Sequence, residues 1–525
     1  MSKFNTAKVK VKKVPVARGV NTPARSRHSL VTTNIAGGKA FTLKDKTELV
    51  TILLTSFVSD TYYTKGDDTS KRVAELVAKV ADKRFIAKAA IYARNEFGMR
   101  SISHVVAGEL AKSTAVKGET WTKEFYDKVV RRVDDMLEIV SYVWKDGKTP
   151  LPNSLKKGFR AAFARYDGFQ LSKYQNNNAG LKLVDLVNLI HPVPTERNKE
   201  ALDALINGKL KNLVTSQNAL TDIGQKTSDE GERAELRKDY WTQVLSERKL
   251  GYTDLIRSLT KIAKDAPEAV DSAVALLTDE KLIAKSLVMP YQLYIAMKMV
   301  EKELGTTSEG RKLVKGLAKA VDISCGNVPV FDGKTLVVVD RSGSMDSPVS
   351  NGKADVLSMA EVGTLMGLFL ARKNDTDVMI FGDTAKYVPY NAGDSILTSV
   401  KTLMEHNRGY GRGGDYHVGH GTNFHAIFGA IKGKYERVII LSDMQSWGKS
   451  AWGSYSVNDM FREYVRKNGP TKLYSYDLAG HGSLQFPEEN VYVCAGFSEK
   501  IFDVMKLLEQ DKEALVKKIE DSIQL

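Results

Sequence analysis

One stretch of the chain decides the fold class of its carboxyl-terminal part. Residues 335–346 read TLVVVDRSGSMD. The run Thr335–Val339 is β-branched or apolar at every position and too short for a helix, as in a buried parallel strand. Asp340 ends this strand, and Ser342 and Ser344 follow in the pattern Asp-x-Ser-x-Ser. Carboxylate and hydroxyl oxygens of this kind suit a hard divalent cation.

Strands and helices alternate around this stretch, over residues 334–525. We expect further strands at Asp377–Phe381, Tyr387–Pro389, Arg437–Leu441, Lys472–Tyr476 and Val491–Cys494, with helices between them. Such alternation predicts a doubly wound α/β sheet, whose ligands bind at the carboxyl ends of the strands. Asp340 lies at one such end, and Asp443 lies at another.

Residues 41–326 have a different character, because apolar residues recur there at three- and four-residue spacing and strand signals are almost absent. The spacing predicts helices at Leu43–Phe57, Ser70–Asp82, Arg84–Phe97, Thr122–Val143, Ser154–Tyr166, Arg233–Leu250 and Asp254–Lys264. Helix pairs of roughly 40 residues favour an α-solenoid of HEAT-like repeats, although no literal sequence repeat is present. We therefore predict a helical-repeat unit over residues 41–326, preceded by a basic flexible arm over residues 1–40.

Charge is distributed unevenly between these parts. The chain has a formal net charge of +14. Residues 1–326 hold 55 Lys and Arg against 38 Asp and Glu, a net charge of +17, whereas the remainder has −3. Ten of the basic residues lie in residues 1–44, before the first acidic residue, Asp45. The excess favours nucleic acid as the ligand of the first part, with a merely solvated tail as the alternative for the arm.

The composition predicts a globular protein of a reducing compartment. The chain is 42% hydrophobic and 27% charged, which is ordinary for soluble proteins. Cys325 and Cys494 are the only cysteines, so no disulfide framework or thiolate metal site is available. The apolar stretch nearest to a membrane-spanning segment, Leu282–Val300, is interrupted by Lys285 and Lys298. We expect a cytoplasmic monomer that does not contact a membrane.

One predicted helix of the basic part gathers several cations. Ser154 is a good helix N-cap, so that Lys157 and Arg160 fall on one face. Lys156 adds a third cation beside them. Such a face either is solvated, stabilised by its own aliphatic stems, or binds RNA.

Two further groups of basic residues are candidates for RNA contacts. Arg94, Arg100 and His104 lie near a helix junction at Gly98, and His191 ends a helix that the following prolines stop. Contacts from these residues would combine phosphate pairing with stacking on splayed bases. The alternative for a single histidine at a helix end is a cap or core residue.

Three loops of the carboxyl-terminal part carry hydroxyl or carboxylate side chains: residues 340–345 (DRSGSM), 421–424 (GTNF) and 441–443 (LSD). Together they resemble the metal-ion-dependent adhesion site of von Willebrand factor A domains. By that resemblance Ser342, Ser344 and Thr422 would bind Mg²⁺ directly through their hydroxyls. Asp340 and Asp443 would act largely through water, and one open position would accept the carboxylate of a partner. The octahedron of oxygens that Mg²⁺ prefers agrees with this set.

Several short motifs extend the resemblance to the helical part: Leu151-Pro152 with Lys156 and Lys157, Leu171-Ser172-Lys173-Tyr174, and Asp185-Leu186-Val187 followed by His191-Pro192. Over residues 40–500 the chain resembles the Ro autoantigen-type family, in which a helical-repeat TROVE ring carries RNA and the von Willebrand-like domain closes it. The family's lysine and histidine that touch the 3′ end of single-stranded RNA in the central hole correspond to Lys173 and His191. A further arginine of that site would fall on Asn177, where this sequence departs from the pattern.

The resemblance implies a noncatalytic RNA-binding protein. Such a protein would hold small noncoding, Y-like RNA and the single-stranded 3′ ends of misfolded RNA in a basic ring, for RNA quality control or degradation. An exoribonuclease or another protein is a candidate partner. We expect RNA contacts from Arg94, Arg100, Lys156, Lys157, Arg160, Lys173 and His191.

Two other functions are weighed against RNA binding. A metal-dependent protein-interaction scaffold would use the adhesion-type site to capture an acidic side chain of a partner. The net charge of +17 on residues 1–326 favours RNA over this alternative. An enzyme is not expected, because Ser342 and Ser442 lack the context of a nucleophile elbow.

Overall fold

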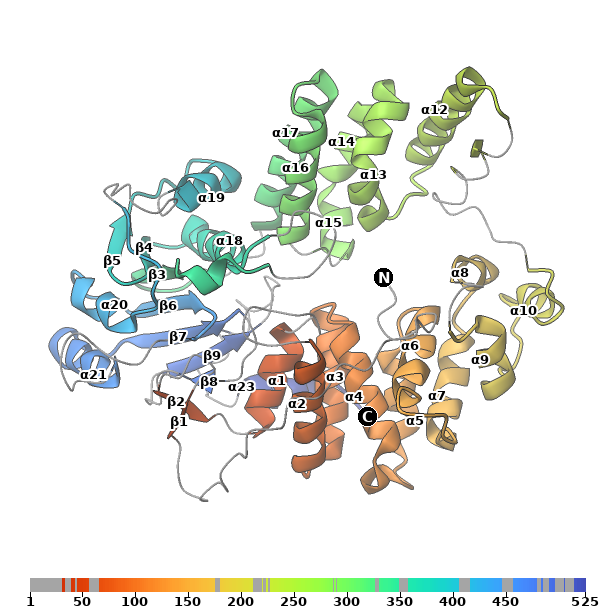
Figure 1. The fold of residues 1–525 in the computed structure, drawn as a ribbon, viewed down its shortest axis with the longest axis horizontal. Coiled ribbons are helices and arrows are strands. Elements are labelled where there is room, and N and C mark those ends of the chain that lie inside the picture. Colours follow the sequence, from red (N-terminus) through yellow and green to blue (C-terminus); the bar gives the residue numbers. More distant parts are fainter. Residues whose placement is uncertain are drawn as a thin grey trace, which may run out of the picture.

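A computed structural model shows a helical region followed by an α/β unit (Figure 1). It describes residues 31–33, 39–42, 45–55, 66–174, 180–210, 220, 223–224, 227–286, 288, 290–325, 330–348, 357–405, 416–445, 457–478, 483–484, 491–495, 505 and 514–525. Residues 1–30 and 34–38 of the predicted arm lie outside these ranges, as does Asn177. None of the helices within them is long and apolar enough to cross a membrane.

The helical region consists of two groups of helices, which lie on opposite sides of the view in Figure 1. The first group comprises α1 (Asp45–Thr55), α2 (Gly66–Lys79), α3 (Lys83–Glu96), α4 (Ser101–Lys112), α5 (Trp121–Val129), α6 (Val133–Val143), α7 (Asn153–Phe163), α8 (Gly168–Lys173), α9 (Leu183–Ile190) and α10 (Lys199–Ile206). The second comprises α12 (Glu230–Ser246), α13 (Tyr252–Asp265), α14 (Val270–Leu277), α15 (Glu280–Ser286), α16 (Pro290–Leu304) and α17 (Ser308–Ser324). Helices close in sequence pack on one another, as α5 does on α7 and α16 on α17.

The prediction of a single helix over Thr122–Val143 is wrong, because the chain breaks between α5 and α6. The carboxylate of Asp135 accepts hydrogen bonds from the backbone N–H groups of Arg131 and Arg132, each at 3.0 Å. These donors precede the first turn of α6, where unpaired N–H groups and the helix dipole favour a negative charge. The break lets α6 pack against α4.

The α/β unit contains a six-stranded sheet with the order β5-β4-β3-β6-β7-β9. Its strands are β3 (Thr335–Asp340), β4 (Thr376–Phe381), β5 (Ala385–Val388), β6 (Arg437–Ser442), β7 (Lys472–Asp477) and β9 (Val491–Ala495). β5 runs antiparallel to β4, and the other neighbours are parallel. The predicted strand at Tyr387–Pro389 thus starts two residues earlier than expected and ends one residue earlier.

The central strand of the sheet is β3, and all six of its residues are buried. Val337 and Val339 face a core shared with α18 (Met359–Lys373) and α19 (Ile396–Glu405). Leu336 and Val338 face the opposite core, which includes residues of α20 (Phe424–Ala430) and α21 (Val457–Asn468). Burial on both faces explains why this strand is a continuous apolar run rather than an alternating one. The predicted doubly wound α/β sheet is confirmed.

A small antiparallel sheet joins the start of the chain to the α/β unit. It consists of β1 (Val31–Thr33), β2 (Lys39–Thr42) and β8 (Ser483–Leu484), in the order β1-β2-β8. The described part of the predicted flexible arm is therefore strand. Its partner β8 lies more than 400 residues away in sequence, and a pairing over such a separation leaves no local pattern that sequence analysis detects.

The α/β unit contacts both ends of the helical region (Figure 1). Its carboxyl-terminal helix α23 (Ala514–Ser522) packs on α1 and α3. There the Lys46 ammonium lies 2.9 Å from the Glu520 carboxylate. At the other end, Asp322 of α17 lies 3.5 Å from the guanidinium of Arg372 on α18. The two groups of helices are thus linked through the α/β unit.

Candidate nucleic-acid interface

Lys173 is the last residue of the short helix α8, and its side chain is exposed. Asp167 begins this helix with a capping box, in which its carboxylate accepts the Gln170 N–H at 2.8 Å and the Gln170 side chain accepts the Asp167 N–H at 3.0 Å. The Lys173 ammonium lies 3.4 Å from the carboxylate of Asp254, near the start of α13. This ion pair joins the two groups of helices.

His191 follows α9 and is exposed, as the RNA-contact prediction requires. Its backbone has φ 47° and ψ 65°, and its N–H donates to the Val187 carbonyl at 2.8 Å. A left-handed conformation costs a non-glycine residue of order 1 kcal/mol, so surrounding contacts must hold it. One such contact is the hydrogen bond from Arg160 Nε of α7 to the carbonyl of Ile190. Arg160 therefore fixes the chain beside His191.

Lys156 and Lys157 lie in the second turn of α7, where Lys157 is exposed and Lys156 half-buried. Within the described ranges neither ammonium group has a carboxylate partner. Gly158 brings this helix close to α5, because a Cβ atom there would lie 2.5 Å from Tyr126 Cβ and 2.6 Å from the Lys123 carbonyl oxygen. Lys157 therefore faces solvent, whereas Lys156 does so only in part.

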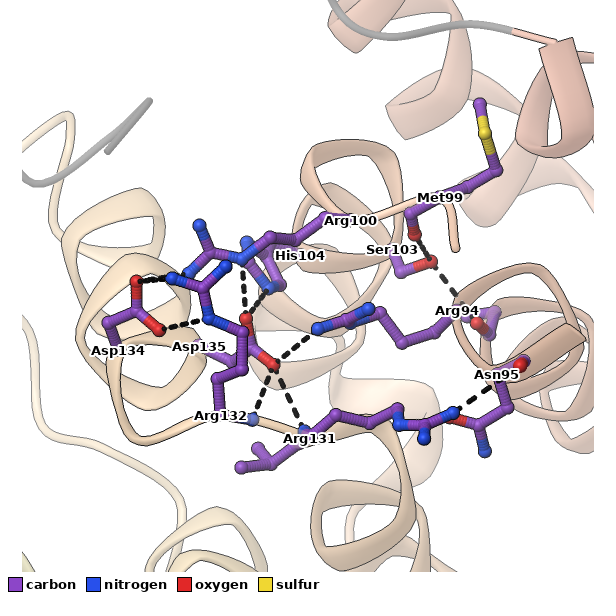
Figure 2. Close-up of polar contacts among 12 residues, drawn as sticks. Arg94, Asn95, Met99, Arg100, Ser103, His104, Arg131, Arg132, Asp134 and Asp135 are labelled. Carbon is purple, nitrogen blue, oxygen red and sulfur yellow. Dashed lines mark hydrogen bonds and ion pairs between the residues drawn. The ribbon is translucent and has the colours of Figure 1, made fainter. Parts of the chain in front are cut away.

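Arg94 and Arg100 belong to a largely buried network around Asp135 (Figure 2). The Asp135 carboxylate accepts hydrogen bonds from Arg94 Nη2 at 2.9 Å and from Arg100 Nε at 2.6 Å. His104 Nε2 lies 3.1 Å from the same carboxylate, and Arg100 also pairs with Asp134 at 2.8 Å. The side chain of Arg94 is only 9% exposed. Arg94 is therefore not part of an accessible RNA surface, and the charge of Arg100 is already paired with two carboxylates.

Titration of the Asp135 network is set by burial and by the neighbouring cations. Burial alone would raise the pKa of Asp135, but the hydrogen bond from His104 and the charges of Arg94 and Arg100 hold it well below its usual range. Burial lowers the pKa of His104, so this imidazole is neutral at neutral pH and its Nε2–H donates to Asp135. The network ties α6 to α3 and α4.

Arg132 and Asp254 adjoin Lys173 and were not identified from the sequence. The Arg132 guanidinium lies over the Tyr174 ring, 4.8 Å from its centroid, and is held by two hydrogen bonds of 3.0 Å to Asp134. Tyr174 directly follows Lys173 in the chain. Arg132 lies 42 residues before Tyr174 and Asp254 lies 81 residues after Lys173, so no sequence spacing pointed to either contact.

The predicted oxygen ligands of the α/β unit gather where β3 and β6 end. These strands are neighbours in the sheet. Asp340 accepts a hydrogen bond from the Ser342 N–H at 2.8 Å and from Ser442 Oγ at 2.5 Å. The hydroxyl oxygens of Ser342 and Ser344 lie 3.3 Å apart. Asp443 follows β6 directly and is 1% exposed.

Thr422 lies in a loop that contacts the Asp340 loop through a hydrogen bond of 2.8 Å from the Gly343 N–H to the His420 carbonyl. The loop is anchored by Asp383, whose carboxylate accepts the His420 N–H at 3.1 Å. Gly421 is needed there because a Cβ atom would lie 2.1 Å from Asp383 Oδ1. Thr422 itself is 4% exposed.

Burial raises the pKa of Asp340, and the nearby charge of Asp443 raises it further. Burial likewise raises the pKa of Asp443. Two buried carboxylates without a compensating cation are costly, and a bound cation removes that cost. Together with the hydroxyls of Ser342 and Ser344, this donor set fits a hard divalent cation that binds oxygen.

Comparison with known families identifies the first part of the helical region. Residues 39–240 match the family model of the TROVE domain. This chain carries a TROVE domain. The fold of this chain is similar to the crystal structure of the RO (RSR) protein of Deinococcus radiodurans, with a TM-score of 0.58, 17% sequence identity, and coverage of 89% of this chain and 100% of that chain. At this identity the likeness shows the fold: the order of a helical region and an α/β unit is shared with the Ro protein.

A second similarity concerns a shorter part of this chain. It is 27% identical over 138 residues to telomerase protein component 1 of Rattus norvegicus. The match covers 25% of this chain and 5% of that relative. The chain therefore spans only a small part of the length of this relative. The match over residues 39–240 confirms the predicted TROVE domain, and the similar fold confirms the predicted order of a helical region and an α/β unit.

Proposed function

We propose that this protein binds RNA and that Lys173 and His191 contact a single-stranded 3′ end. The observation that carries this proposal is the position of Lys173, exposed at the end of α8 and facing Asp254 of the second group of helices. The TROVE domain and the net charge of +17 on residues 1–326 support RNA as the ligand.

The chemistry of these residues suits single-stranded RNA. The Lys173 ammonium exchanges its carboxylate partner for a phosphate, and the His191 imidazole stacks on a base or donates to a ribose hydroxyl. Lys156 and Lys157 add phosphate contacts that do not depend on sequence. We further propose that the protein holds small noncoding, Y-like RNA and the 3′ ends of misfolded RNA without cleaving them, in RNA quality control, with an exoribonuclease as a candidate partner.

The loops of the α/β unit form the second part of the proposal. Mg²⁺ would be held there by Ser342, Ser344 and Thr422 through their hydroxyls, with Asp340 and Asp443 acting largely through water. An open position on such an ion accepts a carboxylate of a partner protein. The buried carboxylates with raised pKa values support a cation at this place. A metal-dependent protein-interaction function therefore remains the second candidate.

A binding experiment with two RNAs tests the proposal. A hairpin with a single-stranded 3′ tail and the same hairpin with a blunt end are titrated with the wild-type protein and with the Lys173→Ala, His191→Ala double variant. We expect the double variant to bind the tailed RNA about tenfold more weakly. The slope of log K against log salt concentration should become shallower by about one, since one phosphate contact is removed. Binding to the blunt hairpin is expected to change little.

Lys315→Ala serves as the matched control, because Lys315 is an exposed lysine of α17. Equal affinity of the double variant and the wild type for the tailed RNA would overturn the assignment of Lys173 and His191. Failure of the wild-type protein to bind either RNA would overturn the proposed function as a whole.

A further inference from the structure

A cavity of about 300 Å³ lies between α13 and α16. Ile256, Ile295 and Met299 contribute aliphatic and thioether walls, and the Thr260 hydroxyl contributes a polar group. Met299 is 41% exposed, although it is a large apolar residue. Mostly apolar walls with a few polar groups are typical of a site for a small organic ring system.

Arg257 lines the same cavity and is exposed. Over the part of the chain that the structure describes, no carboxylate lies within ion-pair distance of its guanidinium group. Two turns further along α13, Lys264 has a different environment, since its ammonium pairs with Glu303 at 2.8 Å. The cavity therefore combines apolar walls with an unpaired guanidinium, a group that binds phosphate with two parallel hydrogen bonds.

The cavity borders the start of α13, where the Lys173–Asp254 ion pair also lies. Thr253, which lines the cavity, directly precedes Asp254, the ion-pair partner of Lys173. A polyanion that displaces Asp254 from Lys173 thus reaches the end of α13 where the cavity begins. Its next phosphate would lie near Arg257, three residues further along the same helix.

We propose that this cavity takes one base of single-stranded RNA, while Arg257 pairs with the phosphate of the same nucleotide. The inference rests on the RNA-binding function proposed above and adds a base-binding site to it. Ile256 and Met299 supply apolar lining for a flat base, and Thr253 and Thr260 are hydroxyl-bearing lining residues that suit hydrogen bonds to its edge. An amphipathic partner helix needs a groove for residues over two turns, whereas a cavity of about 300 Å³ holds one ring system.

The test uses the full chain and a set of tailed hairpins in which an abasic ribose replaces each tail nucleotide in turn. We expect one tail position at which loss of the base weakens binding about tenfold, which corresponds to ~1.4 kcal/mol. A 2-aminopurine at that position should change its fluorescence when the wild-type protein binds, because the base leaves its neighbours and enters the cavity.

Two variants connect this position to the cavity. Ala296→Phe fills the cavity, so the penalty of the abasic position should disappear in this variant, as in a double-mutant cycle. Arg257→Ala, an exposed change that leaves the core intact, should weaken binding of every tailed RNA about three- to tenfold and lower the salt dependence by about one unit. Lys315→Ala is again the charge-matched control, and it should bind as the wild type does.

The outcomes separate the two proposals. If the wild type binds the tailed RNA but every abasic position is equivalent and Arg257→Ala binds like the wild type, the cavity is not a base site and the proposed function stands. If the wild type does not bind the tail, both proposals fail. If Ala296→Phe does not fold, the Arg257→Ala and abasic measurements still decide whether the cavity binds a base.

Discussion

Lys173 and Asp254 form an ion pair of 3.4 Å, although they lie 81 residues apart and on different groups of helices. Their side chains are 34% and 45% exposed. An exposed pair of this kind contributes about 0–1 kcal/mol, because water and salt screen it. The pair therefore holds the two groups of helices only weakly, and Lys173 is free to exchange Asp254 for a phosphate.

Asp254→Asn should strengthen the binding of tailed RNA two- to fivefold at low salt, since it removes the carboxylate that competes for Lys173. Fluorescence anisotropy with a labelled tail measures the change. Asp271→Asn is the control, because Asp271 is an exposed acid of α14 that pairs with Lys312 at 2.9 Å. Affinity that is unchanged or lower in Asp254→Asn would show that Asp254 does not compete with RNA.

Asp135→Ala should destabilise the helical region by about 3–5 kcal/mol, because it leaves the buried charge of Arg94 without its partner. The backbone N–H groups of Arg131 and Arg132 also lose their acceptor. Urea denaturation followed by far-ultraviolet circular dichroism measures the loss. Asp134→Ala, at a side chain that is 22% exposed, should cost about 1 kcal/mol or less. Equal losses of unfolding free energy in both variants would contradict the conclusion that Asp135 holds the network together.

His104 should make the helical region less stable as the pH falls below 6.5. Its folded-state pKa is lowered from 6.5, so below that pH the unfolded chain binds a proton that the folded chain does not. The pKa of Asp135 is depressed, so its contribution is present above its unfolded value of 3.8 and does not change between pH 7 and 5. His104→Gln keeps a neutral donor but does not titrate. Its melting temperature should therefore fall less between pH 7 and pH 5 than that of the wild type, and parallel curves would exclude His104 as the titrating group.

Asp340→Asn should weaken divalent-cation binding about 10- to 100-fold, because the carboxylate that orients the bound water is lost. Mn²⁺ prefers the same oxygen ligands as Mg²⁺, and its electron paramagnetic resonance signal measures the free ion. Asp346→Asn, at an exposed residue of the same loop, should bind Mn²⁺ as the wild type does. RNA affinity should stay nearly unchanged in Asp340→Asn. Loss of both Mn²⁺ binding and RNA binding would show that the RNA site needs the bound cation in order to form.

The sequence predicted the architecture and the oxygen-rich loops because both depend on local patterns. The run before Asp340 is apolar at consecutive positions since β3 is buried on both faces. Asp340, Ser342 and Ser344 lie within five residues, and the parallel pairing of β3 with β6 places Asp443 beside them. The failure at Thr122–Val143 has a different origin, because the apolar spacing continues through a break that the Asp135 carboxylate stabilises.

The sequence by itself determined most of the helices, the strands of the six-stranded sheet and the side chains that follow β3 and β6, since a period of 3.6 or a buried apolar run depends on neighbouring residues. Only the tertiary structure decided which cations face solvent. Arg94 and Lys157 are both basic residues of amphipathic helices, yet Arg94 is buried against Asp135, 41 residues away, whereas Lys157 is exposed. Whether a charge is paired depends on its distance in space from an opposite charge, and the packing of helices remote in sequence sets that distance.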